Sequence, residues 1–357
     1  MGPVTGDDSP APGVVLAAGA GPGRGTDPEQ HRRCIAQAFT RLAACGHLDL
    51  PLPGRGRTRT RWEALGQWAR WDLSLARLAE GHADAIAILA DLDAQHGDDI
   101  PVTGPDVRWG VWAAEPPGYS LAARRVPGGW RLSGVKPFCS GARVCTHALV
   151  SAREGESRRL FAVRTDQPGI GPVPDSWPGP GMAGSDTLDV GFDAVRATPV
   201  GEPGAYLQRP GFHHGGIGVA ACWQGGAAAV ARTLLTASRT WDLGPHALAH
   251  LGAVDARLST VDVLLDGAAT AVDADPHDRE GKAALRTMRV RAAVEDAADD
   301  VLRRVGRALG ATPLGHDAVH ARAVADLTVY LRQHHAERDL AALGRAASES
   351  RSGWGDT

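Results

Sequence analysis

The chain has 357 residues, with 38 Lys and Arg against 41 Asp and Glu and a formal net charge of -3. A chain of this length can bury a large core and form two or three structural units. Its dispersed, nearly balanced charge argues against a nucleic-acid or membrane-surface partner, and it lacks the roughly 18 uninterrupted apolar residues of a transmembrane helix. Five cysteines without a Cys-x-x-Cys pair predict reduced thiols in a cytoplasmic protein and argue against a zinc site.

The first part of the chain divides into a loose terminus and a helical unit. Residues 1–28 are rich in Gly, Pro and Ala and predict a flexible N-terminus. Over residues 29–105, apolar residues recur at helical spacing and predict a helical domain. Its longest helical stretch covers 62–94, and we expect an interruption near Gly81 and His82.

The composition and hydrophobic pattern of the sequence then change twice. Residues 106–203 alternate apolar and polar side chains between Pro/Gly turns, which predicts a central β-barrel or sandwich domain. Residues 204–357 are rich in Ala, Leu, Val and Arg and predict a C-terminal four-helix bundle domain. The predicted fold is therefore α+β with three units. We expect the bundle helices at about 218–240, 247–271, 281–309 and 318–345.

Two short motifs in the central domain are typical of a site that holds a planar ring. The first is Ala114-Glu115-Pro116 followed by Gly118, and the second is Phe138-Cys139-Ser140. An aromatic ring and a hydroxyl close together at a strand end can stack on such a ring and hydrogen-bond to its edge. In this order and spacing the motifs resemble the paired flavin motifs of the acyl-CoA dehydrogenase family. The resemblance implies an FAD cofactor held by residues 114–116 and 138–140, with Ala114 replacing the family's usual Thr.

The resemblance extends into the helical bundle, where it also shows departures. Arg239 matches a family arginine that reaches the cofactor diphosphate of a neighbouring subunit, which implies a homodimer or homotetramer. The family's Gln-x-x-Gly-Gly-x-Gly run is missing from 304–315. The family's catalytic Glu follows an Arg-Asp pair, and the same spacing from Asp326 reaches His334, beside His335. His can act as a base near neutral pH, so these two histidines are the candidate catalytic residues.

The resemblance implies an FAD-dependent oxidoreductase that dehydrogenates the α,β bond of a small-molecule acyl thioester. Two alternatives stay open. One is a flavin-dependent monooxygenase of the same fold, which the histidine pair and the Phe-Cys-Ser-Gly form of the second motif would suit. The other is a degenerate, non-catalytic scaffold or binding protein, which the missing Glu and Gln-Gly-Gly run would suit.

Two further histidine pairs invite a metal interpretation. They are His213-His214 and the i, i+4 pair His246 and His250. Metal sites need three or four ligands, and neither pair has an evident third partner. We therefore expect pocket lining or helix entry for these residues, and no metal site.

Overall fold

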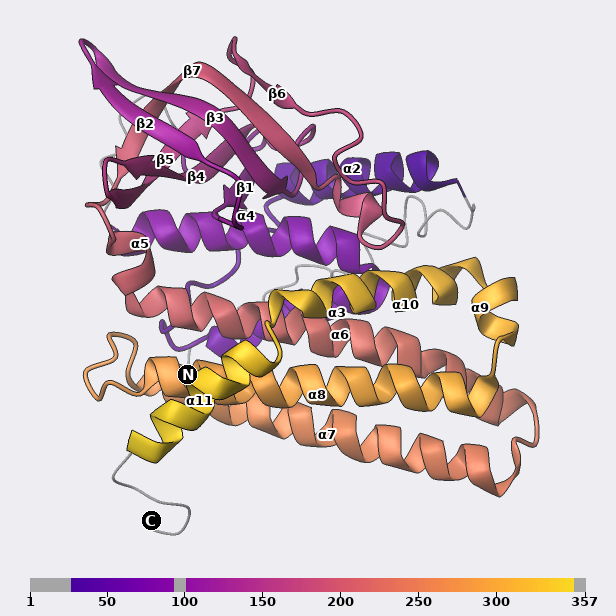
Figure 1. Cartoon of the computed structure of the whole chain (residues 1–357). Helices are drawn as coiled ribbons and strands as arrows, with labels where there is room; N and C mark the ends of the chain where they lie inside the picture. Colours follow the sequence, from indigo (N-terminus) through magenta and orange to yellow (C-terminus); the bar gives the residue numbers. More distant parts are fainter. Residues whose placement is uncertain (1–26, 93–100, 350–357) are drawn as a thin grey trace, which may run out of the picture.

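The computed structural model describes residues 27–92 and 101–349, which form a β unit on top of layers of helices (Figure 1). The predicted order of helical unit, central β-barrel and C-terminal helical bundle is confirmed. The predicted flexible N-terminus lies, except for its last two residues, outside the described residues. The domain boundaries that we placed at 105/106 and 203/204 stay predictions.

The N-terminal unit consists of three helices, two of which begin at a capping aspartate. Asp27 caps the first helix by accepting a hydrogen bond from the Glu29 amide at 3.0 Å. Asp72 ends the second helix and caps the third, which explains why the long helical stretch breaks there and not at Gly81-His82. His82 instead lies within the third helix. The helices are α2 (Pro28–Ala44), α3 (Thr58–Trp71) and α4 (Leu73–Asp91).

The central unit is a small barrel of mostly antiparallel strands. The sheet runs in the order β1-β4-β2-β3-β7-β5, and β5 also pairs with β4, which closes the ring. Closure lets the backbone N–H and C=O groups of the edge strands pair within the sheet. The strands are β1 (Trp109–Trp112), β2 (Leu121–Val126), β3 (Gly129–Cys139), β4 (His147–Glu154), β5 (Ser157–Arg164), β6 (Ile170–Pro172) and β7 (Leu188–Val200), with the 3₁₀ turn η1 (Ala183–Ser185) before β7.

The C-terminal unit is built on three long helices and a shorter fourth. The helices are α5 (Ala205–Gln208), α6 (Pro210–Thr240), α7 (Gly244–Ala274), α8 (Ala283–Leu309), α9 (Thr312–His316), α10 (Ala318–Tyr330) and α11 (Glu337–Glu349). The single helix predicted over 318–345 is wrong in its middle. The chain passes through the 3₁₀ turn η2 (Leu331–Gln333), becomes extended at His334 and takes a positive φ of 43° at Ala336.

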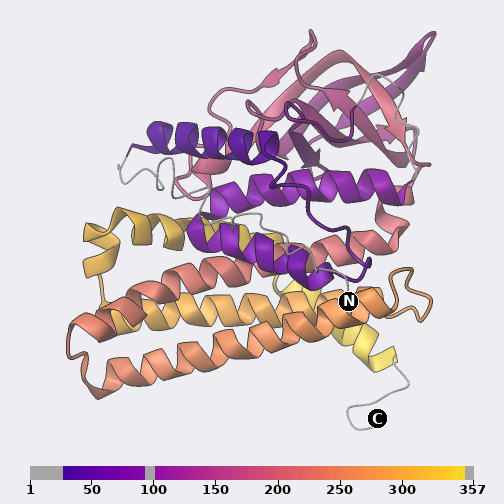
Figure 2. The ribbon, with the colours of Figure 1, turned by 180° about the vertical axis from the view of Figure 1, so that it is seen from behind.

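Helix α4 joins the two halves of the molecule. It lies directly under the barrel and contacts β1 on one side and α6 on the other (Figure 1). His82 fixes the upper contact, because its Nδ1 accepts a hydrogen bond of 3.0 Å from the Trp109 amide. Seen from behind, α3 packs across α6 and α7 (Figure 2). Among the described residues, no helix is long and apolar enough to cross a membrane.

Candidate functional site

The end of β3 presents an aromatic ring at the surface and a hydroxyl just beneath it. Phe138 has φ 58°, which turns its side chain outward, and it is 46% exposed. Its ring packs edge-on against Trp177, with the ring centroids 6.1 Å apart. Cys139 and Ser140 point inward and are buried. Burial raises the pKa of the Cys139 thiol well above its usual range, so this cysteine is inert packing.

A chain of hydroxyl groups runs inward from Ser140. Its Oγ lies 2.9 Å from Thr187 Oγ1, which lies 2.7 Å from Ser185 Oγ. Ser185 donates its own proton to the Met182 carbonyl oxygen at 2.7 Å. This fixes the direction of the chain, since Thr187 must then donate to Ser185 and Ser140 to Thr187. Ser140 can turn to donate to a ligand, because Thr187 then loses only an accepted hydrogen bond.

The first motif lies beside the second, but its glutamate has a structural role. Glu115 accepts a hydrogen bond of 2.8 Å from Ser151 and pairs with the Arg158 guanidinium at 2.6 Å. The Lys136 ammonium is 3.6 Å away and donates to the Ser151 hydroxyl at 2.7 Å. Burial lowers the pKa of Lys136 to about 8, and the nearby Glu115 opposes that shift. Glu115 therefore compensates a buried cation.

The loop of the first motif also reaches the exposed aromatic. Ala114 is exposed and Pro116 is half-buried. A hydrogen bond to Asp189 raises the pKa of Tyr119, and the Phe138 amide lies 3.4 Å from the same carboxylate. The two motifs therefore share one edge of the barrel, as their order and spacing suggested.

The two candidate histidines lie in different environments. His334 is buried, and its Nδ1 makes no hydrogen bond among the described residues. The nearest acidic atom to this nitrogen is a Glu295 oxygen at 3.9 Å. Burial lowers the pKa of His334, opposed by Glu295, so its imidazole is neutral at pH 7. His335 is exposed, 3.4 Å from Asp339. Within the part of the chain that the structure describes, the contacts of His334 are with its own turn and the helices beside it, and none reaches Ser140.

Arg239 lies where the sequence placed it, at the exposed C-terminal end of α6. A role toward the cofactor of a second subunit stays a prediction.

The other histidine pairs behave as packing or surface groups. His214 is buried with its Nε2 3.1 Å from the Pro276 carbonyl, while His246 lies at the start of α7.

A cavity of about 590 Å³ opens among the helices of the N- and C-terminal units. Its walls are the α3–α4 junction, the C-terminal part of α6 with the link to α7, the end of α8, and α9 with the first part of α10. Two buried carboxylates, Asp72 and Asp326, line it. This volume is typical of a pocket for a small molecule.

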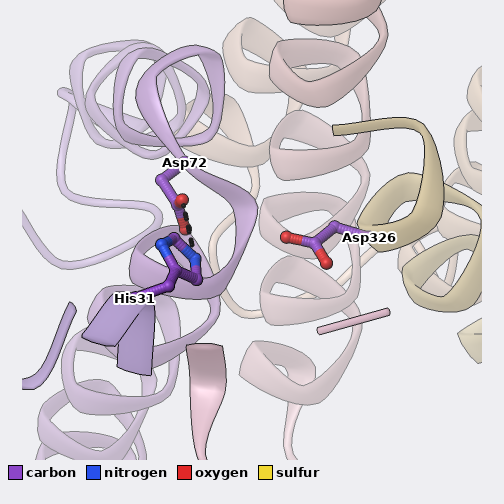
Figure 3. A group of neighbouring side chains, drawn as sticks. All are labelled: His31, Asp72 and Asp326. Carbon is purple, nitrogen blue, oxygen red and sulfur yellow. Dashed lines mark ion pairs between the residues drawn. The ribbon is translucent and has the colours of Figure 1, made fainter. Parts of the chain in front are cut away.

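The two carboxylates form a cluster with His31. Figure 3 shows the His31 ring facing Asp72, with the Asp326 carboxylate directed toward both. One ligand atom from each residue lies within 4.8 Å of the others, and His31 Nε2 is 3.3 Å from Asp72 Oδ2. Burial, followed by the nearby charge of Asp72, raises the pKa of Asp326 to about 8. Asp326 is therefore mostly protonated at pH 7.

The cluster is connected to the hydroxyl chain of the barrel. Asp326 accepts a hydrogen bond of 2.5 Å from the Met182 amide, and Met182 is the residue whose carbonyl ends the chain from Ser140. Gly184 allows His31 to pack against the same turn, since an added Cβ would lie 2.7 Å from His31 Nε2.

Our sequence reasoning missed this cluster. His31, Asp72 and Asp326 are far apart in the chain and form no motif. Asp72 could have been found as a helix N-cap before an apolar helix, and Asp326 as the aspartate from which we counted to His334. For His31 the sequence carries no signal.

Comparison with known proteins agrees with this architecture. The family model of the acyl-CoA dehydrogenase middle domain matches residues 115–195, which covers the first motif from Glu115 onward, the second motif and the hydroxyl chain. A structure of KijD3 in complex with FMN and dTDP-3-amino-2,3,6-trideoxy-4-keto-3-methyl-D-glucose has a TM-score of 0.77 at 23% identity, covering 96% of this chain and 94% of that one. Methanesulfinate monooxygenase MsuC from Pseudomonas fluorescens has a TM-score of 0.71 at 19% identity, covering 91% and 97%.

Among curated proteins, the amino sugar nitrososynthase DnmZ of Streptomyces peucetius is 32% identical over 182 residues, which is 47% of this chain and 45% of DnmZ. The L-evernosamine nitrososynthase of a Micromonospora species is 43% identical over 84 residues, 22% of this chain and 20% of that protein. The matches thus span less than half the length of these relatives.

Fold and site together define a protein with the architecture of acyl-CoA dehydrogenase-like flavoproteins. Residues 115–195 match the middle domain of the acyl-CoA dehydrogenase family, and the fold of the chain agrees with that resemblance, as its motifs predicted. The relatives do not support dehydrogenation of an acyl thioester. They favour the alternative of a monooxygenase with the same fold.

Proposed function

We propose that the chain is a flavin-dependent monooxygenase that oxidises the amino group of a nucleotide-linked amino sugar. The observation that carries the proposal is His334, a buried neutral imidazole where the resemblance places the carboxylate base of a dehydrogenase. The named activities of the curated relatives support the same class of substrate.

The β3 edge suits the ring of a flavin. Phe138 and Trp177 offer aromatic surface, and the hydroxyl of Ser140 lies just beneath it. A hydroxyl donor at this edge stabilises negative charge on the ring. The adenine end of FAD has less support, because short helix α9 stands in place of the glycine-rich run. We therefore expect a flavin cofactor, which is either FAD, as the resemblance implies, or FMN.

A bound reduced flavin supplies two electrons and reacts with oxygen, so that an amine becomes a hydroxylamine and the second oxygen atom leaves as water. In this scheme Ser140 orients the ring edge. The amine must be neutral when it is oxidised, because its lone pair forms the new bond. His334 is a proton acceptor for this step, since burial disfavours its charged form.

The two neighbouring histidines provide a matched test. His334→Gln should lower the yield of oxidised amino sugar about 100-fold, the typical contribution of a positioned acid–base group. His335→Gln should stay within about twofold, because that ring is exposed. The measurement is mass spectrometry of a dTDP-linked amino sugar after reaction with oxygen and chemically reduced FMN or FAD. Equal yields from both variants would refute the role of His334.

The assembly and location follow as further proposals. Arg239 and the exposed side chains Trp241, Leu248 and Val263 lie on α6, the α6–α7 link and α7, and they suit a homodimer or homotetramer formed through the bundle. Light scattering of the purified protein gives the assembly directly. The cytoplasmic location stays a prediction, consistent with five free thiols.

A further inference from the structure

One face of α8 carries three polar residues at a spacing of four, namely Thr287, Arg291 and Glu295. Residues four apart are neighbours on a helix surface, so their side chains point toward the same surroundings. Thr287 donates a hydrogen bond of 2.9 Å to the His213 carbonyl oxygen. Arg291 donates one of 2.9 Å through Nη1 to the Gly216 carbonyl oxygen. This face therefore joins α8 to the first two turns of α6.

The same guanidinium holds the turn that carries His334. Its second nitrogen, Nη2, donates a hydrogen bond of 2.9 Å to the carbonyl oxygen of Gln333, the residue directly before His334. The guanidinium carbon also lies 4.5 Å from the centre of the Trp223 ring on α6, a distance at which a cation and an aromatic ring attract each other. Arg291 thus connects α6, α8 and the turn after α10 through one planar group. A lysine cannot replace it in this role, because all the donors of lysine lie on a single nitrogen.

The turn depends on such contacts because the chain after it is weakly anchored. Leu331 is fully buried before the turn. His334 is then extended, Ala336 has a φ of 43°, and none of the residues of α11 is buried. The position of the imidazole therefore depends on the polar contacts between its turn and α8.

Glu295 faces the inner nitrogen of the same imidazole. One of its carboxylate oxygens, Oε1, accepts a hydrogen bond of 2.9 Å from Arg332, and the other, Oε2, lies 3.9 Å from His334 Nδ1. A neutral imidazole has a proton on one nitrogen and a lone pair on the other. A lone pair on Nδ1 would face the negative charge of Glu295, whereas a proton there is attracted to it. The carboxylate thus favours the proton on Nδ1 and leaves the basic lone pair on Nε2.

Four charged or titratable groups act on the His334 ring. Arg291 and Glu295 come from α8, and His335 and Asp339 come from the turn and α11. Burial lowers the pKa of His334. The two carboxylates oppose that shift, whereas Arg291 and His335 add to it. The two residues of α8 therefore act on the ring in opposite directions.

We propose that Arg291 and Glu295 are positioning residues for the base of the oxidation. Arg291 fixes the backbone from which the His334 ring projects. Glu295 keeps the proton on Nδ1, so that Nε2 accepts the proton of the substrate amine, and it stabilises the positive charge that the imidazole then gains. This inference rests on the proposed function, since it assigns the two residues through which His334 acts.

The state of the imidazole can be measured without any oxidation, by nitrogen NMR of the full chain labelled with ¹⁵N-histidine. The signals of His334 are those that His334→Gln removes. In the unmodified protein we expect the neutral ring to carry its proton on Nδ1. A proton on Nε2 would overturn the role of Glu295.

The same spectra test the charge of Glu295. Glu295→Gln should lower the pKa of His334 by about 1 pH unit, because it removes a nearby opposite charge. Asp296→Asn removes a carboxylate from the exposed side of the same helix, so it is the matched control and should leave this pKa unchanged. Equal effects of the two variants would show that Glu295 has no specific influence on the ring.

Arg291→Lys separates the placement of the turn from the charge beside it. Lysine keeps the positive charge but can reach only one of the two carbonyl oxygens. We expect kcat for the oxidation of a dTDP-linked amino sugar to fall about 10- to 100-fold, as a misplaced catalytic group causes. The KM for the sugar and the pKa of His334 should stay close to their unmodified values. Arg289→Gln, at an exposed arginine of the same helix, is the control, and an equal kcat in both variants would overturn the role of Arg291.

Arg291→Gln removes the charge as well as the planar donor. It should raise the pKa of His334, opposite to Glu295→Gln, and move the acid limb of the pH dependence of kcat to higher pH. Shifts of the same sign in these two variants would contradict the proposal. Arg291→Lys keeps the role of the arginine testable where Arg291→Gln does not fold.

The outcomes separate this inference from the proposed function. A proton on Nδ1 and opposite shifts of the His334 pKa, without any oxidation of an amino sugar, would refute the function alone. Oxidation at the unmodified rate by both Glu295→Gln and Arg291→Lys would refute the positioning roles alone.

Discussion

Replacing Asp326 with Asn should stabilise the protein at alkaline pH. Asp326 is buried, and its pKa is raised from 3.8 to about 8 by burial and by Asp72. Between these values the native state binds a proton that the unfolded state has released, so that the stability of the unmodified protein falls as pH rises. Asn keeps the acceptor for the Met182 amide but has no proton to lose.

The size of the effect follows from the same pKa. A rise from 3.8 to about 8 corresponds to at most about 6 kcal/mol by pH 8.5. Asp72 is close enough to share one proton with Asp326, and His31 and Arg322 also act on the pair. We therefore expect a measured gain of about 2 to 3 kcal/mol.

Urea unfolding of both proteins at pH 5 and pH 8.5 measures this gain. The advantage of Asp326→Asn in free energy of unfolding should be small at pH 5, just above the unfolded pKa of 3.8, and should grow by pH 8.5, where the native carboxyl group also loses its proton. A variant that is less stable than the unmodified protein at pH 8.5 would refute the reasoning, because it would show that the ionised carboxylate stabilises the fold.

Two further predictions concern the barrel. Ser140→Ala should weaken the binding of oxidised flavin several-fold, seen by quenching of flavin fluorescence, and cost about 1 kcal/mol of stability through the lost Thr187 hydrogen bond. Ser133→Ala on the exposed part of the same strand should leave flavin binding unchanged. Glu115→Ala should destabilise by about 3 kcal/mol in thermal unfolding, because the buried Lys136 then lacks its counter-charge. Arg158→Ala, on the solvent side of the same carboxylate, should cost less than about 1 kcal/mol of stability. Equal losses of stability in the two variants would refute the assignment of Glu115 as the counter-charge of Lys136.

The overall architecture could be predicted from the sequence because it depends on local patterns. Helical spacing, strand alternation and Pro/Gly turns are all short-range signals, and the three units follow from them. The helix breaks were harder to place. We expected one at Gly81-His82, but close packing under β1 keeps these residues helical, whereas Asp72 ends α3 through its capping bonds.

The candidate site was only partly predictable. The shared edge of the two motifs follows from their order along the chain, and Ser140 and Phe138 lie there. The role of Glu115 could not be predicted, because its partner Ser151 is on another strand. The cluster of His31, Asp72 and Asp326 is brought together from three helical segments by tertiary packing alone, so no local sequence pattern predicts it.

A single-turnover oxidation tests the central claim most directly. The full chain is mixed anaerobically with reduced FMN or FAD and a dTDP-linked amino sugar, and then exposed to ¹⁸O-labelled oxygen. The account predicts an amino sugar that carries one labelled oxygen atom on nitrogen, formed only when the protein is present. An unchanged amino sugar, together with dehydrogenation of an acyl thioester by the chain with oxidised flavin, would contradict it.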